Sequence, residues 1–295
     1  MAPNAMDRID VLRSARETAG VLLLGLDFDG TLAPIVPRPE DAALLPAARA
    51  ALDLLARRGD THIALVSGRS LVDLRSRVVL DGIYYAGNHG LEIDGPDVHR
   101  IHDAARAARG TLEQLAHDLE RALASVRGVI VEDKILTLSV HFRLVADDAQ
   151  VEHVREQVHA CARAYPGLRL TDGRKVVEIR PDVDWNKGRA FAFLRDTLED
   201  RLGRGPAVFI GDDRTDEDAF RELGTTDCSV IVGDPPQHES IAQARLRSPD
   251  EVAQFLHLLA YDRASRLPCR PHRRKRAVRG LLGRRRPAGG PGSGP

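Results

Sequence analysis

Residues 21–32 read VLLLGLDFDGTL, an apolar run that ends in two aspartates, Asp27 and Asp29. A short run of Val, Leu and Gly is typical of a buried strand, and open α/β sheets bind ligands at the carboxyl ends of their strands. Side chains at positions i and i+2 on a strand share a face but need the backbone to bend to converge on one site, so we expect irregular geometry near Gly30. Such a pair suits a carboxylate nucleophile and a second carboxylate that moves a proton.

The composition indicates a globular protein without a membrane span or a disulfide scaffold. The 295 residues suffice for two domains or for one large core with an insertion, and 43% of them are apolar and 29% charged. No apolar run approaches the roughly 18 residues of a membrane-spanning helix, and the N-terminus lacks the layout of a signal peptide. Cys161, Cys228 and Cys269 are too scattered for a disulfide framework or a zinc site. We therefore expect a cytoplasmic protein with no membrane partner.

A formal net charge of zero conceals a basic C-terminal segment. Residues 263–295 contain eleven Lys and Arg and no Asp or Glu, which leaves 32 basic and 43 acidic residues in the rest of the chain. This charge, together with the Pro/Gly/Ser-rich end, predicts a disordered tail. Such a tail could bind nucleic acid or an acidic partner, but it has no aromatic residue to stack on bases. We expect a dispensable, solvated tail and no nucleic-acid partner.

Strand and helix signals alternate near both ends of the chain. After the first strand we predict a helix at 41–57, a strand at 61–66, a helix at 71–77, a strand near 83–86, and later a helix from 187, a strand at 207–210, a helix at 217–223, a strand at 229–232 and a helix from 251. This order predicts an α/β fold with a parallel sheet and right-handed crossovers.

An α+β block interrupts the alternation. It comprises a long helix at 104–124, strands at 129–132 and 136–142, a helix at 151–164 and strands at 168–171 and 176–179, with turns at Asp133-Lys134 and Asp172-Gly173. We predict an N-terminal extension of residues 1–19, a core of residues 20–103 and 184–262, an inserted cap of residues 104–183 and a tail of residues 263–295.

A second acidic cluster follows the strand predicted at 207–210. Residues 211–218 read GDDRTDED, and oxygen ligands at this density suit Mg²⁺. The helix dipole accounts for acids in the first turn of the next helix, but Asp212, Asp213 and Asp216 precede that helix. At a third strand end, Ser67 lies in a turn whose backbone N–H groups could hold a phosphate oxygen.

Lysine is rare in this chain, with four Lys against 39 Arg. A compact ammonium fits between a carboxylate and a phosphate where a planar guanidinium does not. Retention of lysine therefore favours a functional role for Lys187 and, more weakly, for Lys175.

Taken together, these motifs resemble those of the haloacid dehalogenase-type phosphatases. The shared elements are DFDGTLAPI at 27–35, SGR at 67–69, KG at 187–188 and GDDRTDEDAF at 211–220, in the order and spacing of that superfamily. GNHG at 87–90 and KVVEIRP at 175–181 resemble the trehalose-6-phosphate phosphatases among them. The resemblance covers about residues 20–260 and departs at Asn186, where related sequences often carry Asp. It implies a Rossmannoid core with an inserted α+β cap.

The resemblance also implies a catalytic role for each motif. Asp27 would form an aspartyl-phosphate, Asp29 would act as acid and then as base, and Ser67 and Lys187 would hold the phosphoryl group. Mg²⁺ would be held by Asp27, Asp212 and the backbone carbonyl of Asp29, with Asp213 and Asp216 in or near its outer coordination shell.

The implied substrate is a phosphosugar, trehalose 6-phosphate, and a trehalose-6-phosphate synthase is the expected upstream partner. The residues that would bind this substrate are Asp27, Asp29, Gly30, Ser67, Gly68 and Arg69 in the core, Lys175, Glu178 and Arg180 in the cap, and the further candidates Asn88, His89, His141 and Arg143. A cap that closes would exclude water and assemble the site around the right sugar.

Three other functions remain open. The chain could hydrolyse another phosphosugar, such as sucrose phosphate or mannosylglycerate phosphate, because only the cap residues discriminate among sugars. A phosphosugar mutase of the same superfamily is disfavoured by the large insertion between the second and third motifs. A catalytically silent subunit of a trehalose-synthesis complex would have lost at least one of four residues, Asp27, Asp29, Lys187 and Asp212, and all four are present.

Overall fold

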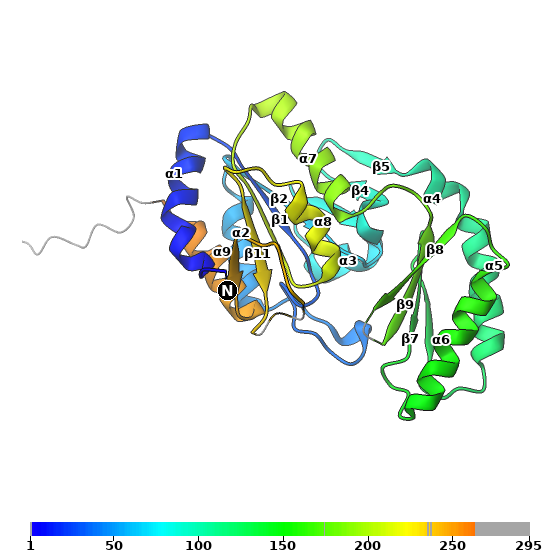
Figure 1. The fold of residues 1–295 in the computed structure, drawn as a ribbon. Coiled ribbons are helices and arrows are strands. Elements are labelled where there is room, and N and C mark those ends of the chain that lie inside the picture. The colour runs from blue at the N-terminus through cyan, green and yellow to red at the C-terminus, as the bar shows by residue number, and fades with distance from the viewer. Residues whose placement is uncertain (1, 174, 235, 237, 263–295) are drawn as a thin grey trace, which may run out of the picture. The chain divides into compact units, whose positions relative to one another are not determined.

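A computed structural model describes residues 2–262 except residues 174, 235 and 237. Its main sheet has eight strands in the order β12-β11-β10-β1-β2-β3-β4-β5 (Figure 1). Neighbours from β12 to β3 are parallel, and β4 and β5 add an antiparallel edge, so the predicted α/β class is confirmed. The strands are β1 (Leu22–Leu26), β2 (Thr61–Val66), β3 (Tyr84–Gly87), β4 (Glu92–Asp94), β5 (His99–Ile101), β10 (Ala207–Gly211), β11 (Cys228–Val232) and β12 (Ala244–Leu246).

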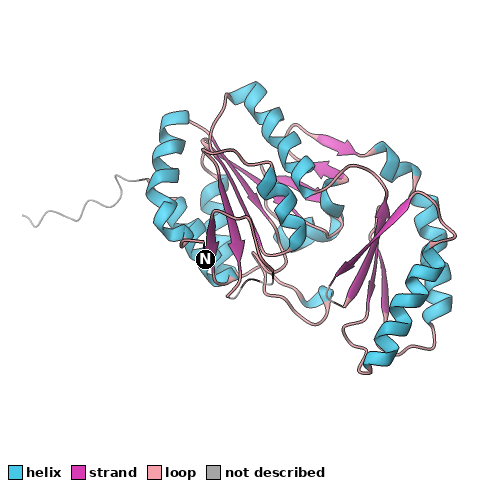
Figure 2. Cartoon of the chain, in the orientation of Figure 1, coloured by secondary structure: helices cyan, strands magenta, loops and turns pink. Residues whose placement is uncertain are grey.

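Helices cover both faces of this sheet (Figure 2). Every residue of β1 is buried because alternate leucines enter different cores: Leu22, Leu24 and Leu26 enter one, and Leu23 enters the other. The first core is completed by α1 (Ile9–Ala19), α2 (Pro46–Ala56), α3 (Leu71–Val78) and α9 (Pro249–Leu259), and the second by α7 (Lys187–Leu202) and α8 (Glu217–Arg221).

Several short elements were not predicted from the sequence. Residues 1–19, treated as an extension, contain the 3₁₀ turn η1 (Ala5–Arg8) and α1, whose buried Arg16 donates to the carbonyl of Leu259 at the end of α9 (Nη1–O 2.9 Å). Strands β4, β5 and β12 have three residues each, too few to show a period. The further 3₁₀ turns are η2 (Pro39–Asp41), η3 (Asn88–Gly90) and η4 (Arg214–Asp216).

The predicted cap, residues 104–183, carries a second sheet, and we call it the insert. Strands β6 (Ile130–Asp133), β7 (Leu138–His141), β9 (Val176–Pro181) and β8 (Leu168–Gly173) are antiparallel in that order. Its two predicted hairpins, β6–β7 and β8–β9, are confirmed. The single helix predicted at 104–124 was wrong: the helix breaks at Ala108, where ψ is −7°, into α4 (Asp103–Ala107) and α5 (Arg109–Leu123).

One face of the insert's sheet is apolar and the other is polar. Helices α5 and α6 (Asp148–Ala162) pack on the apolar face, where Val140, Val177 and Ile179 are buried. Register and alternation place Ser139, His141 and Glu178 on the opposite face, which we call the polar face of the insert. This face has no helical layer of its own in Figure 1, and Glu178 on it contacts His89 of the core.

No helix in the described ranges is long and apolar enough to cross a membrane. The basic tail predicted at residues 263–295 lies outside the described residues.

Candidate active site

Asp27 lies at the carboxyl end of the central strand β1. Its amide continues the β1–β10 ladder by donating to the carbonyl of Ile210 (3.0 Å), and only 4% of the residue is exposed. Beyond it the backbone leaves strand geometry at Gly30, where φ is +76°, as the sequence predicted. A side chain at Gly30 would overlap the carboxylate of Asp212, so the missing Cβ is what lets the first and fourth motifs meet.

Lys187 joins two of the predicted acids. Its ammonium Nζ lies 3.0 Å from Asp27 Oδ1 and 2.8 Å from Asp216 Oδ1. The lysine begins α7, where the side chain of Asn186 caps the helix by accepting from the amide of Arg189 (2.9 Å). Asn186, the departure from the family pattern, therefore still fulfils the capping role that Asp would have.

The acidic motif after β10 divides into inward and outward carboxylates. Asp216 is fully buried, and its Oδ2 accepts from the backbone amides of Asp212 and Asp213 (3.0 Å each), which shapes the turn. Asp27, Asp212 and Asp216 each offer an oxygen within 4.8 Å of the others. The side chain of Asp213 is exposed and instead caps η4 by accepting from the amide of Arg214 (2.6 Å).

This buried cluster places three carboxyl groups around one ammonium. Burial raises the pKa of Asp27 to about 8 although Lys187 opposes the shift, and burial raises the pKa of Asp212 to about 9 with Asp27 and Asp216 adding to it. Burial by itself would lower the pKa of Lys187, but Asp216 and Asp27 raise it above its ordinary value. One ammonium thus faces three carboxylates in a site that water barely reaches.

These residues fit a divalent cation that prefers oxygen ligands. Three converging carboxyl groups supply the oxygen donors that Mg²⁺ prefers in proteins, and the absent side chain at Gly30 leaves room for the carboxyl group of Asp212. Of the five predicted metal residues, Asp27, Asp212 and Asp216 converge. Asp29 was predicted to contribute its backbone carbonyl, and Asp213 stays at the rim.

The carboxylate of Asp29 faces Arg69. Arg69 donates from Nε to Asp29 Oδ2 (2.7 Å) and from Nη2 to Asp29 Oδ1 (2.8 Å), and its Nη1 contacts Asp73 Oδ2 (2.6 Å). The guanidinium also lies 5.3 Å from the centroid of the Phe28 ring. Two predicted site residues, Asp29 and Arg69, are therefore directly paired.

Ser67 lies at the end of β2, one strand from Asp27. Because Leu26 pairs with Leu65, parallel register brings Ser67 to the same sheet edge as the aspartates. The amide of Ser67 donates to Ala86, and the amide of Arg69 lies 3.3 Å from Ser67 Oγ. These two amides of the turn are thus used within the protein. We call residues 67–69 the phosphoryl-binding turn, after the role predicted for it.

The insert reaches the core through Glu178. His89 Nε2 lies 2.9 Å from Glu178 Oε1, and Lys134 Nζ lies 3.6 Å from the same oxygen. Burial would raise the pKa of Glu178, but His89 and Lys134 hold it well below its usual range. A predicted sugar-binding residue therefore lies beside the predicted candidate His89, and Lys134 connects it to the phosphoryl-binding turn by donating to the carbonyl of Gly68 (3.0 Å).

The other predicted insert residues are more widely spread. His141 pairs with Glu132 on the polar face (Nε2–Oε2 2.8 Å), and Arg143 donates to the carbonyl of Val36 in the loop after the first motif (2.6 Å). Lys175 lies in the β8–β9 turn with φ of +58°. Arg180 is on the polar face, and its buried Nε has no hydrogen-bond partner among the described residues.

The sequence of this chain matches the family model for trehalose-phosphatases over residues 25–250. This chain belongs to the trehalose-phosphatase family. All four motifs described above fall inside the matched range. So do β7, which carries His141, and β9, which carries Glu178 and Arg180.

Curated relatives agree with the family match. A trehalose-phosphate phosphatase of Mycobacterium tuberculosis is 43% identical over 244 residues, which cover 79% of this chain and 60% of the relative. An uncharacterized glycosyl hydrolase of the same species is 44% identical over 250 residues, 80% of this chain but 18% of that protein. The chain thus spans 60% or less of the length of these relatives.

Solved structures share the fold. A trehalose-6-phosphate phosphatase related protein is 25% identical with a TM-score of 0.69, covering 81% of this chain and 96% of its own. The C-terminal domain of a C. albicans trehalose-6-phosphate phosphatase is 22% identical with a TM-score of 0.72, covering 88% and 98%. The haloacid dehalogenase-type fold predicted from the motifs is therefore confirmed.

Lys134, which lies among the candidate site residues of this trehalose-phosphatase family member, was not singled out from the sequence. Its Nζ donates to the carbonyl of Gly68 in the phosphoryl-binding turn (3.0 Å) as well as lying near Glu178. The rarity of lysine, which indicated Lys187, applied equally to Lys134 and could have identified it.

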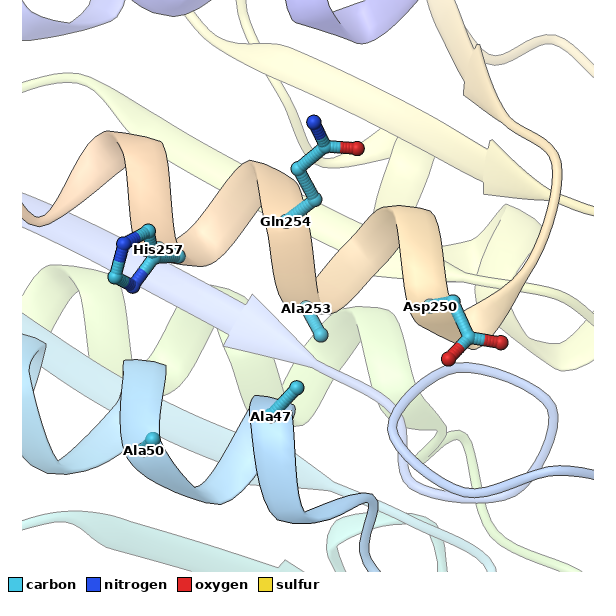
Figure 3. Close-up of a pocket in the computed structure, with 6 residues that line it drawn as sticks. All are labelled: Ala47, Ala50, Asp250, Ala253, Gln254 and His257. Atoms are coloured by element: carbon cyan, nitrogen blue, oxygen red, sulfur yellow. The ribbon is translucent and has the colours of Figure 1, made fainter.

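A separate hollow lies between α2 and α9 (Figure 3). It is lined by three alanines, Ala47, Ala50 and Ala253, and by three polar residues, Asp250, Gln254 and His257. None of these belongs to the carboxylate cluster or to the polar face of the insert, so the candidate site remains at the sheet edge.

Proposed function

We propose that the chain hydrolyses trehalose 6-phosphate to trehalose and phosphate, with Asp27 as the nucleophile. The observation that carries the proposal is the buried ion pair between Asp27 and Lys187 (3.0 Å), at a strand end of a trehalose-phosphatase family member. A carboxylate oriented by an ammonium, in a site shielded from water, suits attack on a phosphoryl group.

The reaction would proceed in two displacements. A carboxylate oxygen of Asp27 attacks phosphorus, the bond from phosphorus to the sugar oxygen breaks, and that oxygen takes a proton from Asp29. Water then attacks the phosphorus of the aspartyl-phosphate and gives its proton to Asp29, which releases phosphate and regenerates Asp27. Dividing hydrolysis in this way replaces one difficult step by two easier ones.

Other core residues would hold the phosphoryl group. Lys187 already lies between Asp27 and Asp216, so its ammonium can pair with a phosphoryl oxygen while keeping Asp27 in place. The Ser67 hydroxyl is at the same sheet edge and would bind a second oxygen.

Asp27, Asp212 and the backbone carbonyl of Asp29 would hold Mg²⁺, with Asp213 and Asp216 in or near its outer shell. When bound, the cation neutralises the charge that the carboxylates and the phosphoryl group bring together. The raised pKa values of Asp27 and Asp212 support this assignment, because they reflect carboxyl groups that are held out of water and close to other aspartates.

The polar face of the insert would recognise the sugar, with Lys175, Glu178 and Arg180 as its principal contacts. The buried Nε of Arg180 lacks a partner among the described residues, and a sugar hydroxyl could supply one. Glu132 and Lys134 extend this polar surface beside Glu178 and His141. We propose that the protein acts in the cytoplasm. A trehalose-6-phosphate synthase in the same compartment would supply the substrate.

The test is phosphate release from trehalose 6-phosphate, sucrose 6-phosphate and glucose 6-phosphate, each with Mg²⁺ and with EDTA. We expect metal-dependent release from the trehalose ester and at least about tenfold less from the others. Comparable release from all three would retain the phosphatase chemistry and reject the assignment of the insert. No release by folded protein would reject the hydrolase and favour a silent subunit.

A further inference from the structure

Asn88 and His89 occupy unusual backbone conformations between the core and the insert. Their φ values are +49° and +58°, and Gly90 follows at +87°. Non-glycine residues enter this left-handed region at an energetic cost, so the surrounding contacts must hold them there. The backbone amides of Asn88 and His89 donate to the carbonyls of Arg69 (2.7 Å) and Ser67 (2.9 Å), which ties this segment to the phosphoryl-binding turn.

The carboxamide of Asn88 is committed to protein partners. Its Nδ2 donates to Glu92 Oε1 (2.8 Å) and to the carbonyl of Lys134 (3.0 Å), and its Oδ1 accepts from Thr137 Oγ1 (2.7 Å). Both partners of Nδ2 are acceptors, which fixes the orientation of the amide. Asn88 and Thr137 are both fully buried, so neither group has water as a substitute.

These partners lie on two sides of one junction. Lys134 and Thr137 belong to the turn that joins β6 and β7 in the insert, whereas Glu92 is in the core and also accepts from the amide of Leu71 at the start of α3 (2.7 Å). Asn88 therefore connects the phosphoryl-binding turn, through its backbone amide, with the β6–β7 turn and, by way of Glu92, with α3.

The β6–β7 turn carries or neighbours the side chains that face the sugar site. Lys134 Nζ reaches Gly68, and Thr137 leads directly into β7, where Ser139 pairs with Glu178 of β9. A shift of the β6–β7 turn would move Lys134 and Glu178 together relative to Ser67. Displacements of about 1 Å in such positioning contacts can reduce rates a hundredfold.

We propose that Asn88 is a positioning residue that fixes the β6–β7 turn of the insert against the phosphoryl-binding turn. This inference rests on the proposed function, and it replaces the sequence-based expectation that Asn88 contacts the sugar. It assigns Thr137 as the matching residue of the insert, a position that no sequence signal indicated.

The test compares two substitutions that remove the Asn88–Thr137 hydrogen bond with one that keeps it; Asn88→Gly also removes the bonds to Glu92 and Lys134. Thr137→Val is isosteric and removes the hydroxyl, Thr137→Ser keeps it, and Asn88→Gly removes the carboxamide while tolerating the positive φ. Thr111→Val in α5, on the other side of the insert's sheet, is the matched control. For Thr137→Val and Asn88→Gly we expect kcat/KM for trehalose 6-phosphate to fall about tenfold, and that for p-nitrophenyl phosphate to stay within about twofold.

Equal losses on both substrates, or a loss in Thr137→Ser as large as in Thr137→Val, would overturn the proposal. Hydrogen exchange of residues 130–141 tests it without any substrate. Exchange should rise in Thr137→Val and Asn88→Gly and remain at the wild-type level in Thr137→Ser and Thr111→Val, and unchanged exchange in the first two would also overturn the proposal. Wild-type protein that hydrolyses no phosphosugar would reject the proposed function, and the exchange data would then decide the role of Asn88 independently.

Discussion

Both carboxylate oxygens of Asp29 accept hydrogen bonds from Arg69, at 2.7 Å from Nε and 2.8 Å from Nη2. The side chain of Arg69 is 8% exposed and is held in turn by Asp73 and by the carbonyl of Pro39 (2.9 Å from Nη2). A planar guanidinium fork of this kind fixes the direction of a carboxylate as well as its charge. Arg69 therefore sets the resting position of the proposed acid.

We expect Arg69→Lys to lower kcat/KM for trehalose 6-phosphate by about 10- to 100-fold, because lysine keeps the charge but loses the fork. The value of kcat/KM covers only the steps up to release of the leaving group, so for p-nitrophenyl phosphate it should fall less than about threefold, since that leaving group needs little protonation. Steady-state kinetics with both substrates would check this. Arg77→Lys, which alters the other arginine that binds Asp73, is the control and should retain wild-type activity. Equal losses on both substrates would separate Arg69 from the proton transfer.

Asp27→Asn should abolish turnover without unfolding the protein. The amide is a poor nucleophile, so phosphate release should drop below about 10⁻³ of the wild-type rate. Lys187 would still pair with Asp216 at 2.8 Å, and a buried carboxyl that is costly to ionise would be gone. The melting temperature in EDTA should therefore match or exceed that of wild type. A folded Asp27→Asn variant with more than a few per cent of wild-type activity would exclude Asp27 as the nucleophile.

The sequence was sufficient to bring the predicted site residues of the core to one edge of the sheet, because parallel topology brings strand ends together. An apolar run ending in Asp27 and Asp29, and another ending in Asp212, must converge once β1 and β10 are neighbours. The departure from strand geometry at Gly30 was also predicted, since a regular strand would hold the carboxylates of Asp27 and Asp29 apart along its length. Local pattern and topology thus predicted the sheet and the buried carboxylates together.

Contacts between the core and the insert were not predictable in this way. Asn88 meets Thr137 and Lys134 from 49 and 46 residues away, and no periodicity reports such a pairing. The exposed position of Asp213 follows from how Asp216 folds the motif back on itself, which composition does not reveal. Lys134 differs from these contacts, because the scarcity of lysine distinguishes it in the sequence just as it distinguishes Lys175 and Lys187.

Glu178→Ala should damage recognition of the sugar more than the chemistry. Removing the carboxylate leaves His89 and Lys134 without their shared partner, and it removes an acceptor for sugar hydroxyls. We expect kcat/KM for trehalose 6-phosphate to fall about 50-fold or more, and that for p-nitrophenyl phosphate to change less than about threefold. Glu152→Ala, on the exposed side of α6, serves as the control. A similar loss on both substrates would show that Glu178 does not act through the sugar.

Stability in the absence of metal should depend on pH in an unusual direction for carboxylates. Burial raises the pKa of Asp27 to about 8 and that of Asp212 to about 9, whereas their ordinary value is 3.8. Between about pH 5 and pH 8 the folded protein therefore keeps protons that the unfolded chain has released, and the free energy of unfolding falls as the pH rises. A bound cation needs these carboxylates deprotonated, so it favours the opposite state.

Thermal unfolding at pH 6 and pH 8, with EDTA or with saturating Mg²⁺, would test this linkage. In EDTA the melting temperature should fall by more than about 5 °C between the two pH values. Mg²⁺ should raise the melting temperature more at pH 8 than at pH 6, because fewer protons must be displaced from the site at pH 8. Asp212→Asn should flatten the pH dependence in EDTA, which separates the cluster from histidines titrating over the same range. If Mg²⁺ raised the melting temperature by the same amount at both pH values, the cation would bind elsewhere than at Asp27 and Asp212.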